Sequence, residues 1–79
     1  MAYHTKNIIK GTFGEFSKIA EEFFELEDAF NQSDKVLQIC EMTDLIGAIE
    51  EYAKKWNLSI IDLKKFSDKT KNSFISGKR

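Results

Sequence analysis

Residues 13–30 read FGEFSKIAEEFFELEDAF, and this stretch decides the fold. Apolar residues recur in it at steps of three and four, which is the spacing of one face of an α-helix. We expect its phenylalanines, at positions 13, 16, 23, 24 and 30, in a core or a subunit interface. Thr12 and Glu15 match the Thr-x-x-Glu capping box, so a helix is predicted over residues 12–31.

A second long helix is predicted from about residue 34 to residue 56, with Ser33 as its N-cap and Asp34 in its first turn. Asn57 ends it. Apolar residues cover well over half of its circumference, and Cys40 is expected among them as a small buried side chain. A helix that is apolar on most sides is buried on most sides, which in a chain of 79 residues predicts a partner subunit.

A third helix is predicted over residues 59–76, from a Ser59–Asp62 capping box to Gly77. Residues 1–11 show no periodicity and are expected to form an N-terminal segment. The whole chain, 1–79, is therefore predicted to be a single all-α domain. It consists of a hairpin of two long antiparallel helices and a C-terminal helix, and it completes a four-helix-type bundle by oligomerisation.

The composition agrees with a small helical protein. The chain has no proline, 32% charged residues and 42% hydrophobic residues, which argues against disorder and collagen-like structure. No apolar run approaches the roughly 18 residues of a membrane span, and no signal peptide follows Met1. With a single cysteine, these features predict a complete cytoplasmic protein with no membrane partner.

Charge is distributed unevenly along the chain. Residues 1–57 hold six lysines and eleven acidic residues, a net charge of −5, whereas residues 58–79 hold six basic and two acidic residues, a net charge of +4. The basic end is suited to phosphate groups, while the acidic body opposes nucleic-acid binding. We therefore expect no nucleic-acid partner, although a solvated charged surface also explains the basic end.

Four carboxylates occupy positions with apolar neighbours. Glu22 and Glu25 are three residues apart on the first helix, as are Glu41 and Asp44 on the second. If the helices are antiparallel, the two pairs can converge, and each like-charged pair at about 4 Å would repel by about 4 kcal/mol at an effective dielectric constant of about 20. Such a cluster takes up protons or binds a cation, and oxygen ligands favour Mg²⁺ or Mn²⁺. The alternative is four ordinary exposed acids.

The acidic pattern resembles a known family motif. Glu21-Glu22-x-x-Glu25, fifteen residues and then Glu41-x-x-Asp44 are similar to the EExxE…ExxD signature of the MazG-like all-α nucleoside triphosphate pyrophosphohydrolases. The run Lys18-Ile19-Ala20 resembles the approach to the first motif, and Leu45-Ile46 resembles the residues after the second. Residues 69–79 resemble the basic C-terminal segment of compact members, including phage-encoded ones.

The resemblance implies a reaction and a set of site residues. A homodimer or homotetramer would cleave the α–β phosphate linkage of (deoxy)nucleoside triphosphates to give a monophosphate and pyrophosphate, in the host cytoplasm if the protein is phage-encoded. Glu21 and Glu22 would be catalytic, and Glu21 would orient water. The implied Mg²⁺ ligands are Glu22, Glu25, Glu41 and Asp44, and the implied phosphate-binding residues are Lys18, Lys69, Lys71 and Arg79.

Three alternatives stay open. The same chemistry could act on another nucleotide, such as an alarmone or phosphoribosyl-ATP. The chain could instead be a non-catalytic helical oligomeric interaction protein that keeps the fold, or a small nucleic-acid binder that uses the basic end. His4, alone near the N-terminus, is assigned no role.

Overall fold

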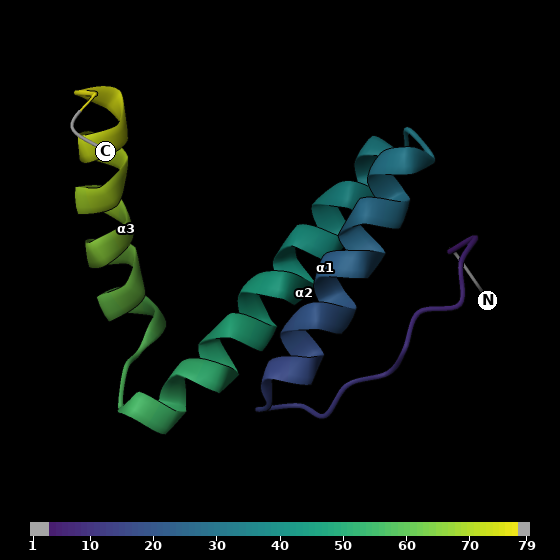
Figure 1. Cartoon of the computed structure of the whole chain (residues 1–79), viewed down its shortest axis with the longest axis horizontal. Helices are drawn as coiled ribbons and strands as arrows, with labels where there is room; N and C mark the ends of the chain where they lie inside the picture. Colours follow the sequence, from purple (N-terminus) through teal and green to yellow (C-terminus); the bar gives the residue numbers. More distant parts are fainter. Residues whose placement is uncertain (1–3, 78–79) are drawn as a thin grey trace.

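The computed structural model describes residues 4–77 and contains no strand among them (Figure 1). Its elements are α1 (Phe16–Asn31), α2 (Lys35–Ala53), the short 3₁₀ helix η1 (Lys54–Trp56) and α3 (Ile60–Ile75). α1 and α2 pack side by side and run in opposite directions across a three-residue connection. The prediction of an all-α chain built on a helical hairpin is therefore confirmed.

The first helix begins four residues later than predicted, at Phe16. The Glu15 N–H donates to the Thr12 carbonyl at 2.9 Å and closes a turn in which Gly14 has φ +89°. Glycine adopts this left-handed conformation without a steric penalty. Glu15 is the N-cap and its side chain makes no capping hydrogen bond, so the predicted Thr12–Glu15 capping box is wrong.

The second helix is capped by Asp34 and not by Ser33. The Leu37 N–H donates to the Asp34 carboxylate at 2.9 Å, whereas Ser33 has φ 58° and belongs to the left-handed turn after α1. Two other boundary predictions are confirmed. Asn57, with φ 60°, follows η1 and ends the second helical stretch, and Ser59 and Asp62 form a complete capping box at the start of α3.

The interior is small and unusually acidic. The buried apolar residues among those described are Ala29, Ala48 and Ala53, and the buried polar residues are Glu21, Glu22, Asp28 and Glu41. Small alanine side chains let two helices approach closely, which brings the carboxylates of both into one layer. The predicted burial of Phe13 and the four phenylalanines of α1 in a core is wrong for the single chain, since all five are at least half exposed, and Cys40 is exposed as well.

The third helix stands apart from the hairpin and is joined to it through η1 and the residues that follow (Figure 1). The radius of gyration is 14.5 Å, against about 11.6 Å for a compact domain of this length. The accessible surface is 6135 Å², against about 4,900 Å² for a compact monomer of 9.1 kDa. Within residues 4–77, no helix has both the length and the hydropathy that crossing a membrane requires.

Candidate metal centre between the first two helices

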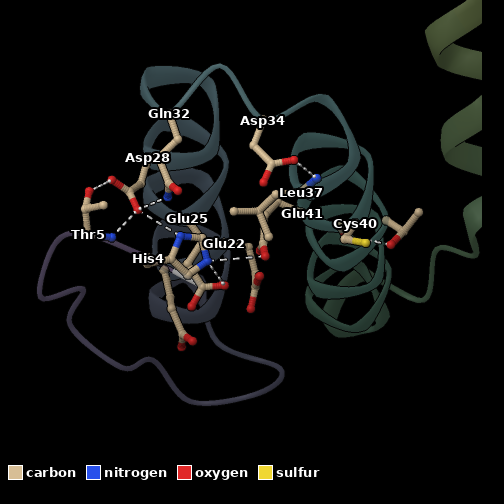
Figure 2. Close-up of polar contacts among 12 residues, drawn as sticks. His4, Thr5, Glu22, Glu25, Asp28, Gln32, Asp34, Leu37, Cys40 and Glu41 are labelled. Atoms are coloured by element: carbon tan, nitrogen blue, oxygen red, sulfur yellow. Dashed lines mark hydrogen bonds and ion pairs between the residues drawn. The ribbon is translucent and has the colours of Figure 1, made fainter. Parts of the chain in front are cut away.

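Four carboxylates meet between α1 and α2. Glu22 and Glu25 come from α1, and Glu41 and Asp44 come from α2; each offers one oxygen atom, and these four atoms lie within 4.8 Å of one another. Figure 2 shows Glu22, Glu25 and Glu41 directed toward a common region between the two helices. The predicted convergence of the two acidic pairs is confirmed, while metal binding by this four-carboxylate group stays a prediction.

The group has a buried end and an open end. Glu22 and Glu41 are only 4% and 6% exposed, Glu25 is half-buried and Asp44 is exposed. At the open end, a hollow of about 370 Å³ is lined by residues that include Lys18, Glu22 and Asp44. Gly47, which also lines the hollow, has open space where a side chain would begin. The hollow therefore gives a small molecule access to two of the four carboxylates.

Two buried oxygen atoms of the group are unpaired. Within residues 4–77, Oε2 of Glu22 and Oε2 of Glu41 have no hydrogen-bond partner. A buried acceptor without a partner costs about 1–3 kcal/mol, and more if it is charged. Since carboxylate oxygens are the ligands that Mg²⁺ and Mn²⁺ prefer, these two atoms fit a bound cation better than they fit an apolar interior.

The size of the group suits one divalent ion. Oxygen ligands on opposite sides of Mg²⁺ lie about 4.1 Å apart, and those around a larger cation such as Ca²⁺ lie about 4.6–5.2 Å apart. The four oxygens of this group are at most 4.8 Å from one another. This upper limit exceeds the spacing of Mg²⁺ ligands and falls in the range of a larger cation, so the carboxylates would have to move closer together to bind Mg²⁺.

The negative charge of the group is destabilised as the protein stands. Burial raises the pKa of Glu22 above its ordinary value, and the neighbouring Glu25 raises it further, while Lys18 opposes the shift. Burial and the proximity of Glu41 likewise raise the pKa of Glu25. A cation between these carboxylates would stabilise their charged forms and so oppose both shifts.

Lys18 borders the group as the resemblance implies, but it is already paired. Its Nζ lies 3.0 Å from Oε1 of Glu22 and 3.2 Å from Oε2 of Glu21. The hydrogen bond to Glu22 is the main cause that raises the pKa of Lys18. The ammonium group therefore neutralises part of the acidic group at the edge of the hollow.

Glu21 lies beside the four-carboxylate group and is not one of its members. Its Oε1 accepts the Gly11 N–H at 2.7 Å, and its Oε2 lies 3.7 Å from Lys10 Nζ. Burial raises the pKa of Glu21, but the hydrogen bonds from Gly11 and Lys18 outweigh burial and lower it overall. Glu21 thus anchors the N-terminal segment to α1 through one charge-assisted hydrogen bond, from Gly11, and an ion pair with Lys10.

The N-terminal segment contributes residues to the site that no sequence pattern indicated. The segment runs antiparallel to α1, and Asp28 accepts the Thr5 N–H at 2.8 Å, the Thr5 hydroxyl at 2.6 Å and the His4 Nδ1–H at 3.0 Å (Figure 2). The Thr5 hydroxyl is the largest of several causes that lower the pKa of Asp28 to about 2. One signal was available: Glu22, Glu25 and Asp28 follow each other at three-residue steps.

His4, for which no role was predicted from the sequence, contacts the acidic group. Its Nε2 lies 3.3 Å from Oε1 of Glu41 and 4.0 Å from Oε2 of Glu25. Burial lowers the pKa of His4, but the hydrogen bond with Asp28 and the charges of Glu41 and Glu25 outweigh burial and raise it. A lone histidine so distant in sequence from the acids carried no pattern that could have revealed this contact.

The predicted phosphate-binding residues near the C-terminus are not gathered at the site. Lys69 and Lys71 are exposed on α3, which does not pack along α1 or α2. Arg79 lies outside the described residues. Within one chain, Lys18 is therefore the one residue of the predicted phosphate-binding set that the described structure places beside the carboxylates.

No protein-family model, curated protein or solved structure matches the chain. The resemblance to the MazG-like family consequently rests on the motif alone and stays a prediction.

Proposed function

We propose that the protein is a Mg²⁺-dependent nucleotide pyrophosphohydrolase that cleaves (deoxy)nucleoside triphosphates between the α and β phosphates. The observation that supports it is the four-carboxylate group with two buried, unpaired oxygens beside an open hollow. The same residues, Glu22, Glu25, Glu41 and Asp44, carry the motif similarity, so the sequence pattern and the geometry agree on one place in the molecule.

The proposed roles follow from position. A bound Mg²⁺ would neutralise phosphate charge and lower the pKa of a water nucleophile. Glu22 and Glu41 hold the buried side of the site rigidly because they are enclosed by the two packed helices, whereas Asp44 faces the hollow from which a nucleotide would enter. Lys18 can exchange its ion pair with Glu22 for a substrate phosphate, which it would bind as a point charge.

We propose that the working form is a homo-oligomer. The accessible surface exceeds that of a compact monomer by about 1,200 Å², and a stable interface buries about 800 Å² per partner. A hollow of about 580 Å³ between α2 and α3 is lined mainly by Ile46, Ile49, Ile60, Ile61 and Leu63. A second copy that fills this hollow would complete the helical bundle and would bring its Lys69 and Lys71 toward the acidic group.

The cytoplasmic location implied by the single cysteine is part of this proposal, because nucleotide pools are cytoplasmic and the thiol of Cys40 is exposed.

The test is a nucleotide panel assayed with Mg²⁺ for release of pyrophosphate rather than orthophosphate. The panel contains the common nucleoside and deoxynucleoside triphosphates, an alarmone and phosphoribosyl-ATP, so that it also decides between the substrate alternatives. Glu22→Gln is expected to lower turnover at least about 100-fold, because it removes a buried ligand. Glu27→Gln, an equal change at an exposed position of α1, is the matched control and should retain full turnover. Equal activity of both variants would reject the site.

One observation favours a second function, that of a non-catalytic interaction protein. Large apolar side chains of all three helices are exposed, among them Phe30, Val36 and Phe74. Exposed apolar side chains in such number favour a protein–protein interface whether or not the chain is an enzyme. A folded oligomer that releases no pyrophosphate from any nucleotide, and whose melting does not respond to Mg²⁺, would favour this alternative.

A further inference from the structure

One histidine nitrogen and two carboxylate oxygens meet where the N-terminal segment crosses the helical hairpin (Figure 2). His4, Glu25 and Glu41 each offer a ligand atom, and these atoms lie within 4.8 Å of one another. The distances from His4 Nε2 are 3.3 Å to Oε1 of Glu41 and 4.0 Å to Oε2 of Glu25. The set contains nitrogen and includes neither Glu22 nor Asp44, so it differs in chemistry from the four-carboxylate group.

The imidazole is held in one orientation by Asp28. The His4 Nδ1–H donates to Oδ2 of Asp28 at 3.0 Å, and Asp28 is itself fixed by Thr5 and by Nε2 of Gln32. Asp28 is 1% exposed, so this carboxylate cannot exchange its partners for water. A carboxylate that accepts the hydrogen of one ring nitrogen and directs the other nitrogen outward is the usual support of a metal-binding histidine.

When the imidazole is neutral, Nε2 of His4 presents a lone pair to two carboxylates, and a cation between the three atoms would bind all of them; when it is protonated, Nε2–H donates to Glu41 instead. Nε2 of His4 points at two carboxylates, and the second oxygen of Glu41, Oε2, is buried and has no hydrogen-bond partner among the described residues. Two ligands of a tetrahedral ion, each bound at about 2.05 Å, lie about 3.3 Å apart. The observed His4–Glu41 distance of 3.3 Å equals that spacing.

We propose that His4, Glu25 and Glu41 form a second metal site, which takes a borderline cation such as Zn²⁺ and shares two carboxylates with the four-carboxylate group. Imidazole nitrogen favours Zn²⁺ over Mg²⁺, whereas the all-oxygen set favours Mg²⁺. The three protein ligands leave a fourth position for water or a phosphate oxygen, as in an open zinc site. The inference shares Glu25 and Glu41 with the proposed function but requires no turnover.

The experiment measures binding of each metal alone to the metal-free full chain by calorimetry. All variants carry Cys40→Ser, which removes the single thiol of the sequence and with it any zinc bound by sulfur. His4→Gln keeps a hydrogen-bonding side chain but removes the imidazole, and it is expected to lower the Zn²⁺ affinity at least about tenfold more than the Mg²⁺ affinity. Asp44→Asn, which alters only the four-carboxylate group, is expected to do the reverse.

Two results would overturn the second site. One is an unchanged Zn²⁺ affinity in His4→Gln whose helical circular dichroism equals that of the parent. The other is an equal loss of both metals in His4→Gln and in Asp44→Asn, which would mean a single site. An absence of pyrophosphate release together with selective loss of Zn²⁺ binding in His4→Gln would reject the hydrolase and leave the second site standing.

Discussion

Replacing Glu41 by glutamine should make the metal-free protein more stable while removing its response to Mg²⁺. Glu41 is 6% exposed and lies within 4.8 Å of Glu22 and Glu25, measured between one oxygen of each. Because 4.8 Å is the upper limit of these separations, each like-charged pair repels by at least about 3.5 kcal/mol at an effective dielectric constant of about 20. When His4 is protonated, its imidazolium, 3.3 Å from Glu41, attracts that carboxylate by about 5 kcal/mol on the same scale.

The two repulsions together exceed the attraction by about 2 kcal/mol, so the neutral amide of Glu41→Gln is favoured by that amount. The repulsion between Glu41 and exposed Asp44 is left out because water screens it. In a chain of this size, a gain of about 2 kcal/mol in the free energy of unfolding raises the melting temperature by about 10 °C. With Mg²⁺ at about 100 times its dissociation constant, the parent should gain about 2.7 kcal/mol, whereas Glu41→Gln should gain almost nothing.

The assay is urea unfolding followed by helical circular dichroism, in a metal chelator and in Mg²⁺, at a fixed protein concentration because the chain is proposed to associate. Glu27→Gln is the control, since it removes one charge at an exposed position of α1. The reasoning is refuted if Glu41→Gln is less stable than the parent in chelator, or if Mg²⁺ stabilises it as much as it stabilises the parent.

Further predictions concern the N-terminal segment, α3 and the apolar hollow. A methyl group on Gly11 would come within 2.3 Å of the Ser17 backbone, so Gly11→Ala should lower the free energy of unfolding by about 1–3 kcal/mol and separate His4 from Glu41. The imidazole signals in the NMR spectrum would report this separation, and an unchanged spectrum would contradict the contact between the N-terminal segment and the hairpin. Ser59→Ala removes the hydroxyl of the capping box and should destabilise α3 by about 0.5–2 kcal/mol without destabilising the α1–α2 hairpin. Amide hydrogen exchange of α3 and of the hairpin would measure both effects. Hydrogen bonds from the Ser59 backbone and side chain lower the pKa of Asp62, so the charged carboxylate stabilises the first turn of α3. The protection of its amides against hydrogen exchange should be full above about pH 4 and should fall as the pH decreases below that value. Asp62→Asn should show no such fall. Ile61→Glu places a charge in the apolar hollow and should shift the sedimentation of the oligomer to that of a monomer. The control Asn72→Glu, which adds the same charge at an exposed position of α3, should not.

The helical class and the meeting of the acids could be predicted because both follow from local spacing. Apolar residues at three- and four-residue steps define one face of α1. The same helical spacing places Glu22 and Glu25 on one face of α1, and Glu41 and Asp44 on one face of α2. The Ser59–Asp62 box was predictable for the same reason, since its hydrogen bonds join residues only three apart.

The errors arose where longer contacts or competing turns decide the structure. Thr12 and Glu15 fit a capping box in sequence. In the structure the Thr12 carbonyl instead accepts the Glu15 N–H and closes a turn at Gly14, so the helix begins at Phe16. The hydrogen bonds of His4 to Asp28 and Glu41 span 24 and 37 residues, and no local pattern encodes them. The phenylalanines were expected in a core because the pattern shows which residues share a face but not whether a partner covers that face.

The separation of α3 from the hairpin has a consequence for how molecules meet. The part of the chain that holds the acids has a net charge of −5, and the part that holds α3 has +4, yet within residues 4–77 α3 makes no extensive packing against α1 or α2. Opposite charges held apart in this way attract the complementary part of a neighbouring molecule over about a Debye length, which is about 8 Å at physiological ionic strength. Dilute buffer should thus speed the encounter of two copies, and concentrated salt should slow it.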